Sequence, residues 1–247
     1  MSLPLIIILV FLSISPLHWN RAMAGEFEQG FIAVREGDFK KAFKLWLPLA
    51  QSGNVDAQNN IGMMYDLGQG VTHDRKAAIN WYRKAAEGGS ADAQNQIGYA
   101  YFTGDGAELN LEEGVHWYLL AAQKGQPVAQ ANLGAAYGEG RGVKQSWELS
   151  TKYYRFAAEQ GHPLAQSNLG VAYMNGYGVN KDPVEACMWL NLALQHTPTS
   201  DAYGRNVISA NLDQLRKNMT YDQINSAQAK AKEWNQSHNN IVKYKPE

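Results

Sequence analysis

Residues 127–142 read PVAQANLGAAYGEGRG, and residues 163–178 read PLAQSNLGVAYMNGYG. The same frame occurs twice upstream, as VDAQNNIGMMYDLGQG at 55–70 and as ADAQNQIGYAYFTGDG at 91–106. The alanine, the glutamine, the glycine, the tyrosine and the Gly-x-Gly turn therefore recur every 36 residues. Four copies at one strict period indicate a protein built by stacking one structural unit on the next.

Each copy predicts a first helix that ends at the Gly-x-Gly turn. Ala57, Ile61 and Tyr65 follow each other at intervals of four residues and so share one helical face. Gly62 lies inside this helix, where glycine costs about 1 kcal/mol relative to alanine. A glycine repeated at that position predicts that a second helix approaches closely. Gly68 and its copies then end the helix, because glycine tolerates a positive φ.

A second helix is predicted to begin at a capping residue in each copy. Asn110 and Glu113 form a capping box, and Asp182 is followed by a proline at the first helical position. Asp74 and Ser146 occupy the same place in their copies. A glutamine also recurs in every copy, directly after the repeated alanine of the first helix: Gln58, Gln94, Gln130 and Gln166. We interpret it as a repeated hydrogen bond to the backbone of an adjacent helix or loop, in preference to a ligand contact.

The ends of the array are less regular. Residues 25–54 fit a degenerate capping repeat with a short first helix and no Gly-x-Gly insertion. The four 36-residue repeats then span 55–198, and 199–247 form a C-terminal helical cap and tail. Within that cap we expect one helix over 203–218 and another over 221–236, the second opened by a capping box of Thr220 and Gln223.

Residues 1–24 are predicted to be a signal peptide. The apolar run at 3–14 is shorter than the roughly 20 residues that span a bilayer, and Ala22-Met23-Ala24 is a cleavage signal of the A-x-A kind. No basic residue precedes the run, so an uncleaved anchor and a mis-assigned start codon stay open as alternatives. Cleavage would leave a periplasmic or secreted protein without a stable membrane span.

Composition and motif searches point away from several kinds of activity. The chain has 22 basic and 23 acidic residues, for a net charge of −1, which argues against nucleic-acid binding by bulk charge. The histidines have no metal-ligand spacing, and Cys187, the one cysteine, occupies an apolar place in the repeat frame. The glycines at 138, 140 and 142 lack the strand and the lysine of a phosphate loop. We therefore predict no catalytic, cofactor-binding or metal-binding residue.

The repeats resemble Sel-one-like repeats, a 36-residue subclass of the tetratricopeptide superfamily. The matching residues are Ala57, Ile61, Gly62, Tyr65, Gly68, Gly70, Val71, Asp74, Ala78, Trp81, Tyr82, Ala85, Ala86 and Gly89, with their copies. The resemblance implies an all-α, right-handed superhelix of about five helix-turn-helix repeats. It also implies a non-catalytic scaffold that binds a protein or peptide partner in a concave groove, in envelope signalling or host interaction.

An enzyme is the alternative that the resemblance leaves open. Cysteine-rich bacterial relatives are described as β-lactamase-like or related to peptidoglycan, but they carry a cysteine pair in each repeat. This chain has a single cysteine, and no serine-lysine constellation accompanies it.

The candidate groove residues are the positions of the first helices that vary between repeats. They lie opposite the stripe of Ala57, Ile61 and Tyr65 when each residue is turned by about 100°. The nine candidates are Asn59, Met63, Asp66, Asn95, Tyr99, Phe102, Ser167, Val171 and Met174. Two interpretations are equally open: these side chains recognise a partner, or they pack against neighbouring repeats.

Overall fold

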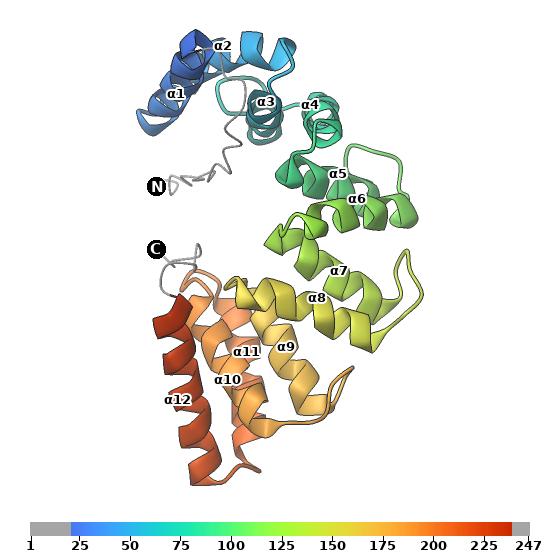
Figure 1. The fold of residues 1–247 in the computed structure, drawn as a ribbon, viewed down its shortest axis with the longest axis vertical. Coiled ribbons are helices and arrows are strands. Elements are labelled where there is room, and N and C mark those ends of the chain that lie inside the picture. Colours follow the sequence, from blue (N-terminus) through green and yellow to red (C-terminus); the bar gives the residue numbers. More distant parts are fainter. Residues whose placement is uncertain (1–20, 239–247) are drawn as a thin grey trace. The chain divides into compact units, whose positions relative to one another are not determined.

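A computed structural model describes residues 21–238 of the chain, with side chains from Gly25 onward. This range holds twelve α-helices and no strand (Figure 1). The chain divides into two compact units, one ending at Ala93 and the other beginning at Gln94. Each unit is described by itself below.

The first unit contains α1 (Arg21–Arg35), α2 (Phe39–Gln51), α3 (Val55–Leu67) and α4 (Arg75–Glu87). Neighbours in this order pack on one another around a core that includes Phe27, Trp46 and Ile61. The sequence predicts a short first helix in this repeat, but α1 has 15 residues. It begins at Arg21, inside the range assigned to the leader, and the remainder of that range (1–20) lies outside the described residues.

The second unit continues the helical hairpins and ends in two further helices. Its elements are α5 (Ala91–Thr103, from Gln94 onward), α6 (Leu111–Gln123), α7 (Pro127–Glu139), α8 (Trp147–Glu159), α9 (Pro163–Asn175), α10 (Pro183–His196), α11 (Ala202–Arg216) and α12 (Tyr221–His238). The last two are the helices predicted at 203–218 and 221–236. Figure 1 shows α12 beside α10, where Trp234 packs on Trp189 at 6.1 Å between ring centroids.

The glycine inside each first helix lies against a large side chain of the second helix, as predicted. A Cβ built on Gly134 would come within 2.6 Å of the Tyr154 ring, and one on Gly62 within 2.7 Å of Tyr82. No real Cβ contact is that short, so only glycine fits between the two helices. Gly30 lies against Trp46 in the same way, so the degenerate first repeat keeps this contact.

The two glycines of the Gly-x-Gly turn have different tasks. Gly140 has a φ of 69° and ends α7 by donating its N–H to the Ala136 carbonyl. Gly142, also at φ 69°, lies against the Leu111 carbonyl at the start of α6, in the preceding repeat. A side chain there would collide with that backbone, so the second glycine lets one repeat stack on the one before it.

The repeated glutamine makes the hydrogen bond predicted for it. The side-chain Nε2 of Gln58 donates to the Ala50 carbonyl at 3.0 Å, and Gln166 donates to Ala158 at 3.1 Å. Gln130 donates to Ala122 in the same way. In each case the acceptor carbonyl lies near the end of the preceding helix and also accepts from the N–H of the glycine three residues later, so the amide provides a second hydrogen bond to it.

Side-chain caps begin the helices, and the predicted capping residues Asp74, Asn110, Ser146, Asp182 and Thr220 are all present. The Asn110 side chain accepts from the Glu113 N–H, and Thr220 and Gln223 form a reciprocal box. The Glu113 carboxylate does not close its own box, because it accepts from the Trp117 indole instead.

The first helix of the last repeat has a histidine as its cap. The Ala165 N–H donates to Nδ1 of His162 at 3.3 Å, so the cap requires that this nitrogen carry no proton. Burial lowers the pKa of His162 from 6.5 to about 4, since a charged ring would lose contact with water.

Gly134→Ala tests the close helix contact. The methyl group would collide with Tyr154, and we expect the free energy of unfolding to fall by about 1–2 kcal/mol after the gain in helix propensity is counted. Urea unfolding of the full chain measures the change. Gly25→Ala is the control, because a Cβ on Gly25 meets no atom within 4 Å. If both variants unfold at the wild-type midpoint, the contact does not restrict this position.

His162→Asn tests the histidine cap. The folded pKa lies below the unfolded one, so the unfolded chain takes up the proton more readily. The stabilisation is therefore present above pH 6.5 and is lost as the pH falls through 4, with an upper bound of roughly 3 kcal/mol. Asparagine caps without titrating in this range, so we expect a smaller loss of stability between pH 7 and pH 4 by urea unfolding. Equal losses in wild type and variant would contradict the assignment.

Candidate protein-binding face

One stripe of each first helix in the second unit is open to solvent. On α7 it consists of Val128, Asn132, Ala135 and Glu139, all half-buried or exposed. Their spacing of four, three and four residues places them on one side of the helix. The alanine repeated in every copy, Ala129 in α7, faces the core and is fully buried.

The same stripe continues on the next two first helices. On α9 it consists of Leu164, Asn168, Val171 and Asn175, and on α11 of Tyr203, Val207, Ala210 and Gln214. Leu164 is 61% exposed and Tyr203 is 81% exposed, which are high values for apolar side chains. Because α9 contacts both α7 and α11, the three helices that carry these stripes are neighbours. We call these twelve residues the first-helix face.

The predicted groove residues of the second unit fall into two environments. Tyr99 is exposed on α5, and Val171 is half-buried within the first-helix face. Asn95 and Ser167 are buried at 8% and 7% exposure.

Phe102 and Met174 are half-buried among neighbouring side chains. The Phe102 ring lies 5.7 Å from Tyr118 and carries the Arg141 guanidinium 4.4 Å above it. Met174 packs against the core around α9 and α10.

In the first unit, Met63 is half-buried and Asp66 belongs to an ion pair. The Asp66 carboxylate accepts from Arg75 at 2.6 Å and from the Tyr82 hydroxyl at 3.4 Å. Burial raises the pKa of Tyr82, and the neighbouring Asp66 charge raises it further. Asn59 is buried at 7% exposure, and its Oδ1 has no hydrogen-bond partner.

Most residues of the first-helix face are not among the predicted groove residues. The prediction used the helix positions equivalent to Asn59, Met63 and Asp66, whereas the exposed stripe uses the positions equivalent to Asp56, Asn60 and Met63. The sequence does contain a sign of the apolar stripe. The second residue of the first helix is aspartate in two repeats and becomes Val128 and Leu164 in the next two.

A hydrogen bond between two side-chain amides connects α7 with α5. Asn132 donates from Nδ2 to Oδ1 of Asn95 in the preceding repeat, at 3.3 Å. Asn60 has the place of Asn132 in its own repeat, but its Nδ2 has no partner although the residue is 2% exposed. Gly30 and Gly62 each lie against an aromatic side chain, so they are equivalent positions of their repeats. By the same alignment, Phe27 is equivalent to Asn95, the residue that accepts the hydrogen bond from Asn132. An apolar residue there offers Asn60 no acceptor.

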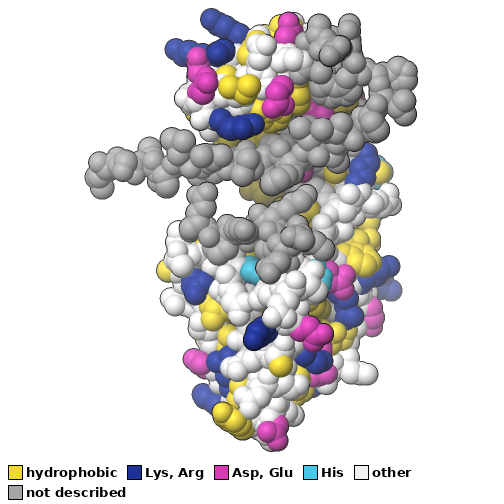
Figure 2. Space-filling model, turned by 60° about the vertical axis from the view of Figure 1, so that its left-hand side comes forward, with side chains coloured by type: hydrophobic (Ala, Val, Ile, Leu, Met, Phe, Trp, Pro, Cys, Tyr) yellow, Lys and Arg dark blue, Asp and Glu magenta, His cyan; other side chains and the backbone are white. Residues whose placement is uncertain are grey.

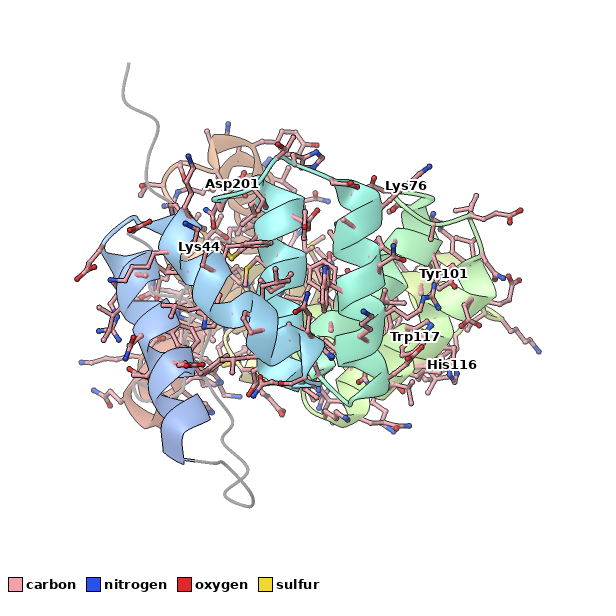
Figure 3. All side chains as sticks on the ribbon, turned by 90° about the horizontal axis from the view of Figure 1, so that it is seen from above. Lys44, Lys76, Tyr101, His116, Trp117 and Asp201 are labelled. Atoms are coloured by element: carbon pink, nitrogen blue, oxygen red, sulfur yellow. The ribbon has the colours of Figure 1, made fainter. Side chains whose placement is uncertain are left out.

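The chemical groups that could support other activities are dispersed. In the described part of the chain, no three His, Cys, Asp or Glu side chains lie close enough to hold a metal ion. Cys187 is fully buried, as predicted. His116 is exposed on α6 beside Trp117. Figure 3 shows these two residues together with Tyr101, which belongs to α5. None of the helices between residues 21 and 238 is long and apolar enough to cross a membrane.

Repeated helix-turn-helix pairs with an open first-helix face define the class of α-helical repeat scaffolds. The family model described as Sel1 repeat matches residues 21–54, 55–90, 91–126, 127–162 and 163–196. The chain therefore belongs to the Sel1 repeat family. Proteins of this family are generally protein-interaction scaffolds and typically not enzymes, and they are often extracytoplasmic.

Two solved structures resemble the chain over most of its length. One is c5321, a protective antigen of uropathogenic Escherichia coli, with 33% identity, a TM-score of 0.76 and coverage of 87% of this chain and 45% of that one. The other is a Sel1 repeat protein of Oxalobacter formigenes, with 29% identity, a TM-score of 0.70 and coverage of 87% and 83%. This chain thus spans less than half of the E. coli protein. A search of curated proteins found no match.

Asn60→Leu tests whether the unpaired amide is a cost to the fold. A buried polar group without a partner costs about 1–3 kcal/mol, so we expect leucine to leave the urea midpoint unchanged or raise it. Asn132→Leu is the matched variant, and it should lower the midpoint because Asn95 would lose its donor. A large loss of stability in Asn60→Leu alone would show that Asn60 has a task that the structure does not reveal.

Proposed function

We propose that this protein is an exported, non-catalytic scaffold that binds a protein or peptide partner on the first-helix face of its second unit. The observation that carries the proposal is the exposure of Leu164, Tyr203 and Val207 on the neighbouring helices α9 and α11. None of these positions is used by the helix contacts, turns or caps that hold the repeats together. Exposed apolar side chains in neighbouring positions are typical of interaction sites.

The second helix α8 exposes both charged and aromatic side chains. Its exposed residues include Glu148, Lys152 and Glu159, together with Trp147 and Phe156, each 41% exposed. Both aromatic rings have partners within the chain, since Trp147 stacks on Tyr177 and the Lys152 ammonium lies over Phe156. On the surface of the second unit that Figure 2 shows, basic and acidic side chains are mixed among uncharged ones.

Of the nine groove residues predicted from the sequence, Tyr99 and Val171 are the ones we retain as direct contacts. Tyr99 extends the apolar surface onto α5, where it is 45% exposed. The buried members, such as Asn95 and Ser167, support the helices beneath that surface. Asn95 does so through its hydrogen bond with Asn132.

The proposed export rests on the sequence of residues 1–24 and on the family. The E. coli relative is a protective antigen. We infer a periplasmic or secreted location for this chain and an interaction within the cell envelope or with a host.

Site-specific photo-cross-linking in the source organism tests the binding face. A photoreactive phenylalanine derivative at Ala135 or at Val171 should give the same cross-linked protein, identified by mass spectrometry. The same derivative at Lys152 on α8 is the control and should not give it. Leu164→Asp, elsewhere on the face, should abolish the product while the helical circular dichroism is unchanged. Equal products from Ala135 and Lys152, or an unaffected product in Leu164→Asp, would overturn the proposal.

A further inference from the structure

We propose that the aromatic pair formed by Trp147 and Tyr177, on the surface of the second unit, binds the pyranose ring of a neutral saccharide. Trp147 is the first residue of α8, and Tyr177 lies in the turn between α9 and α10. Neither side chain belongs to the first-helix face. The saccharide site is therefore a second site, and it does not depend on the proposed function.

The two rings stack on each other and remain open to solvent. Their centroids lie 4.5 Å apart, with 18° between the ring planes, and Trp147 and Tyr177 are each 41% exposed. Because each ring covers one face of the other, the exposed part lies on the outer faces and the edges. Tryptophan and tyrosine with this much open surface are typical of binding sites, since a rigid ring contributes contact area at a small cost in conformational entropy.

The turn that carries Tyr177 is fixed to α8 by two contacts. The Thr151 hydroxyl donates to the Tyr177 carbonyl at 2.7 Å, and Thr151 is 2% exposed. Gly178, with a φ of 64°, lies against the Trp147 carbonyl. The backbone under both rings is thus held in place before a ligand arrives, which lowers the entropic cost of binding.

The stacking of one repeat on the next does not require the aromatic rings. In the preceding repeat the same two places hold Leu111 and Arg141, and Gly142 lies against the Leu111 carbonyl there as well. The place of Thr151 holds Val115, which has no hydroxyl. The tryptophan, the threonine and the tyrosine therefore differ together from the preceding copy, and their common effect is a rigid, exposed aromatic surface.

Polar side chains of several kinds accompany the aromatic pair. The exposed residues within four positions of either ring, which we call the rim, are Lys144, Gln145, Glu148, Asn180 and Lys181. Hydroxyl groups both donate and accept hydrogen bonds, so a saccharide can pair with ammonium, amide and carboxylate groups alike. A polyanion would meet Glu148, a polycation would meet both lysines, and an apolar partner would remove water from all five side chains without replacing its hydrogen bonds.

A pyranose ring matches the aromatic surface in shape and polarity. When its hydroxyls are equatorial, axial C–H groups cover both faces of the ring, and the polar groups lie around its edge. The face of an aromatic ring is the negative part of its quadrupole, so it attracts hydrogens that neighbouring oxygens have made positive. The aromatic pair would contact the face of the sugar, and the rim would bind its hydroxyls.

NMR of the isotope-labelled full chain with cellotetraose, a neutral saccharide with equatorial hydroxyls, tests this proposal. The indole N–H signal of Trp147 is assigned by its loss in Trp147→Phe. We expect added cellotetraose to shift this signal until the shift saturates. Sorbitol has hydroxyls but no ring, so it should leave the signal in place at the same concentration.

Two variants distinguish the aromatic pair from the rest of the surface. Trp147→Leu combined with Tyr177→Arg introduces the side chains that the preceding repeat carries, so the helical circular dichroism should be unchanged. Isothermal titration calorimetry should show at least tenfold weaker binding of cellotetraose by this double variant. Phe156→Ala is the matched control, because Phe156 is equally exposed on α8, and it should bind as tightly as wild type.

Five outcomes would contradict the saccharide site. The first three are a Trp147 signal that cellotetraose does not shift, an equal shift with sorbitol, and wild-type affinity in the double variant. A Trp147 signal that moves on dilution without saccharide would assign the pair to a contact between copies of the chain. Loss of the cross-linked protein from Ala135 in the double variant would assign the pair to the protein partner instead.

Discussion

The structure depends on the contact between a glycine of each first helix and a bulky side chain of the second. Tyrosine provides that side chain at Tyr82, Tyr118 and Tyr154, tryptophan at Trp46 and leucine at Leu190. Since the glycine has no Cβ, the ring can lie directly on the helix backbone, and the axes of the two helices approach closely. The contact fixes which side of the first helix faces inward. The opposite side is then free to vary without disturbing the hairpin.

A second set of interactions joins one hairpin to the next within each unit. The repeated glutamine reaches the end of the preceding helix, and the second turn glycines Gly70, Gly142 and Gly178 lie against the start of the preceding second helix. Both contacts involve backbone atoms of the neighbour. They therefore depend little on which side chains that neighbour carries. This explains how the repeats can differ so much at Asp66, Phe102, Gly138 and Met174 while keeping one period.

Most of the frame could be predicted from the sequence because each of its parts repeats. A glycine at one fixed helical position, a glutamine and a capping residue every 36 residues each have one physical explanation, and the structure confirms them. The length of α1 could not be predicted, because the first repeat lacks the Gly-x-Gly turn that aligns the others. The side of the first helices that faces a partner was even harder to predict than the length of α1. An angle of about 100° per residue separates two sides of a helix, but it does not show which neighbours cover residues at their border, such as Asn59 and Asn95.

The return of α12 onto α10 has a consequence for how such a chain can change in length. Ala227 and Ala231 of α12 are buried in the core of the second unit, and Lys230 pairs with Glu185 at the start of α10. The surface that would receive another hairpin after α10 is thus already occupied by residues of the chain itself. An additional repeat placed after residue 238 could therefore not pack on this surface of α10. New repeats can be accommodated by duplication upstream of α10, where each hairpin both offers and receives the same contacts.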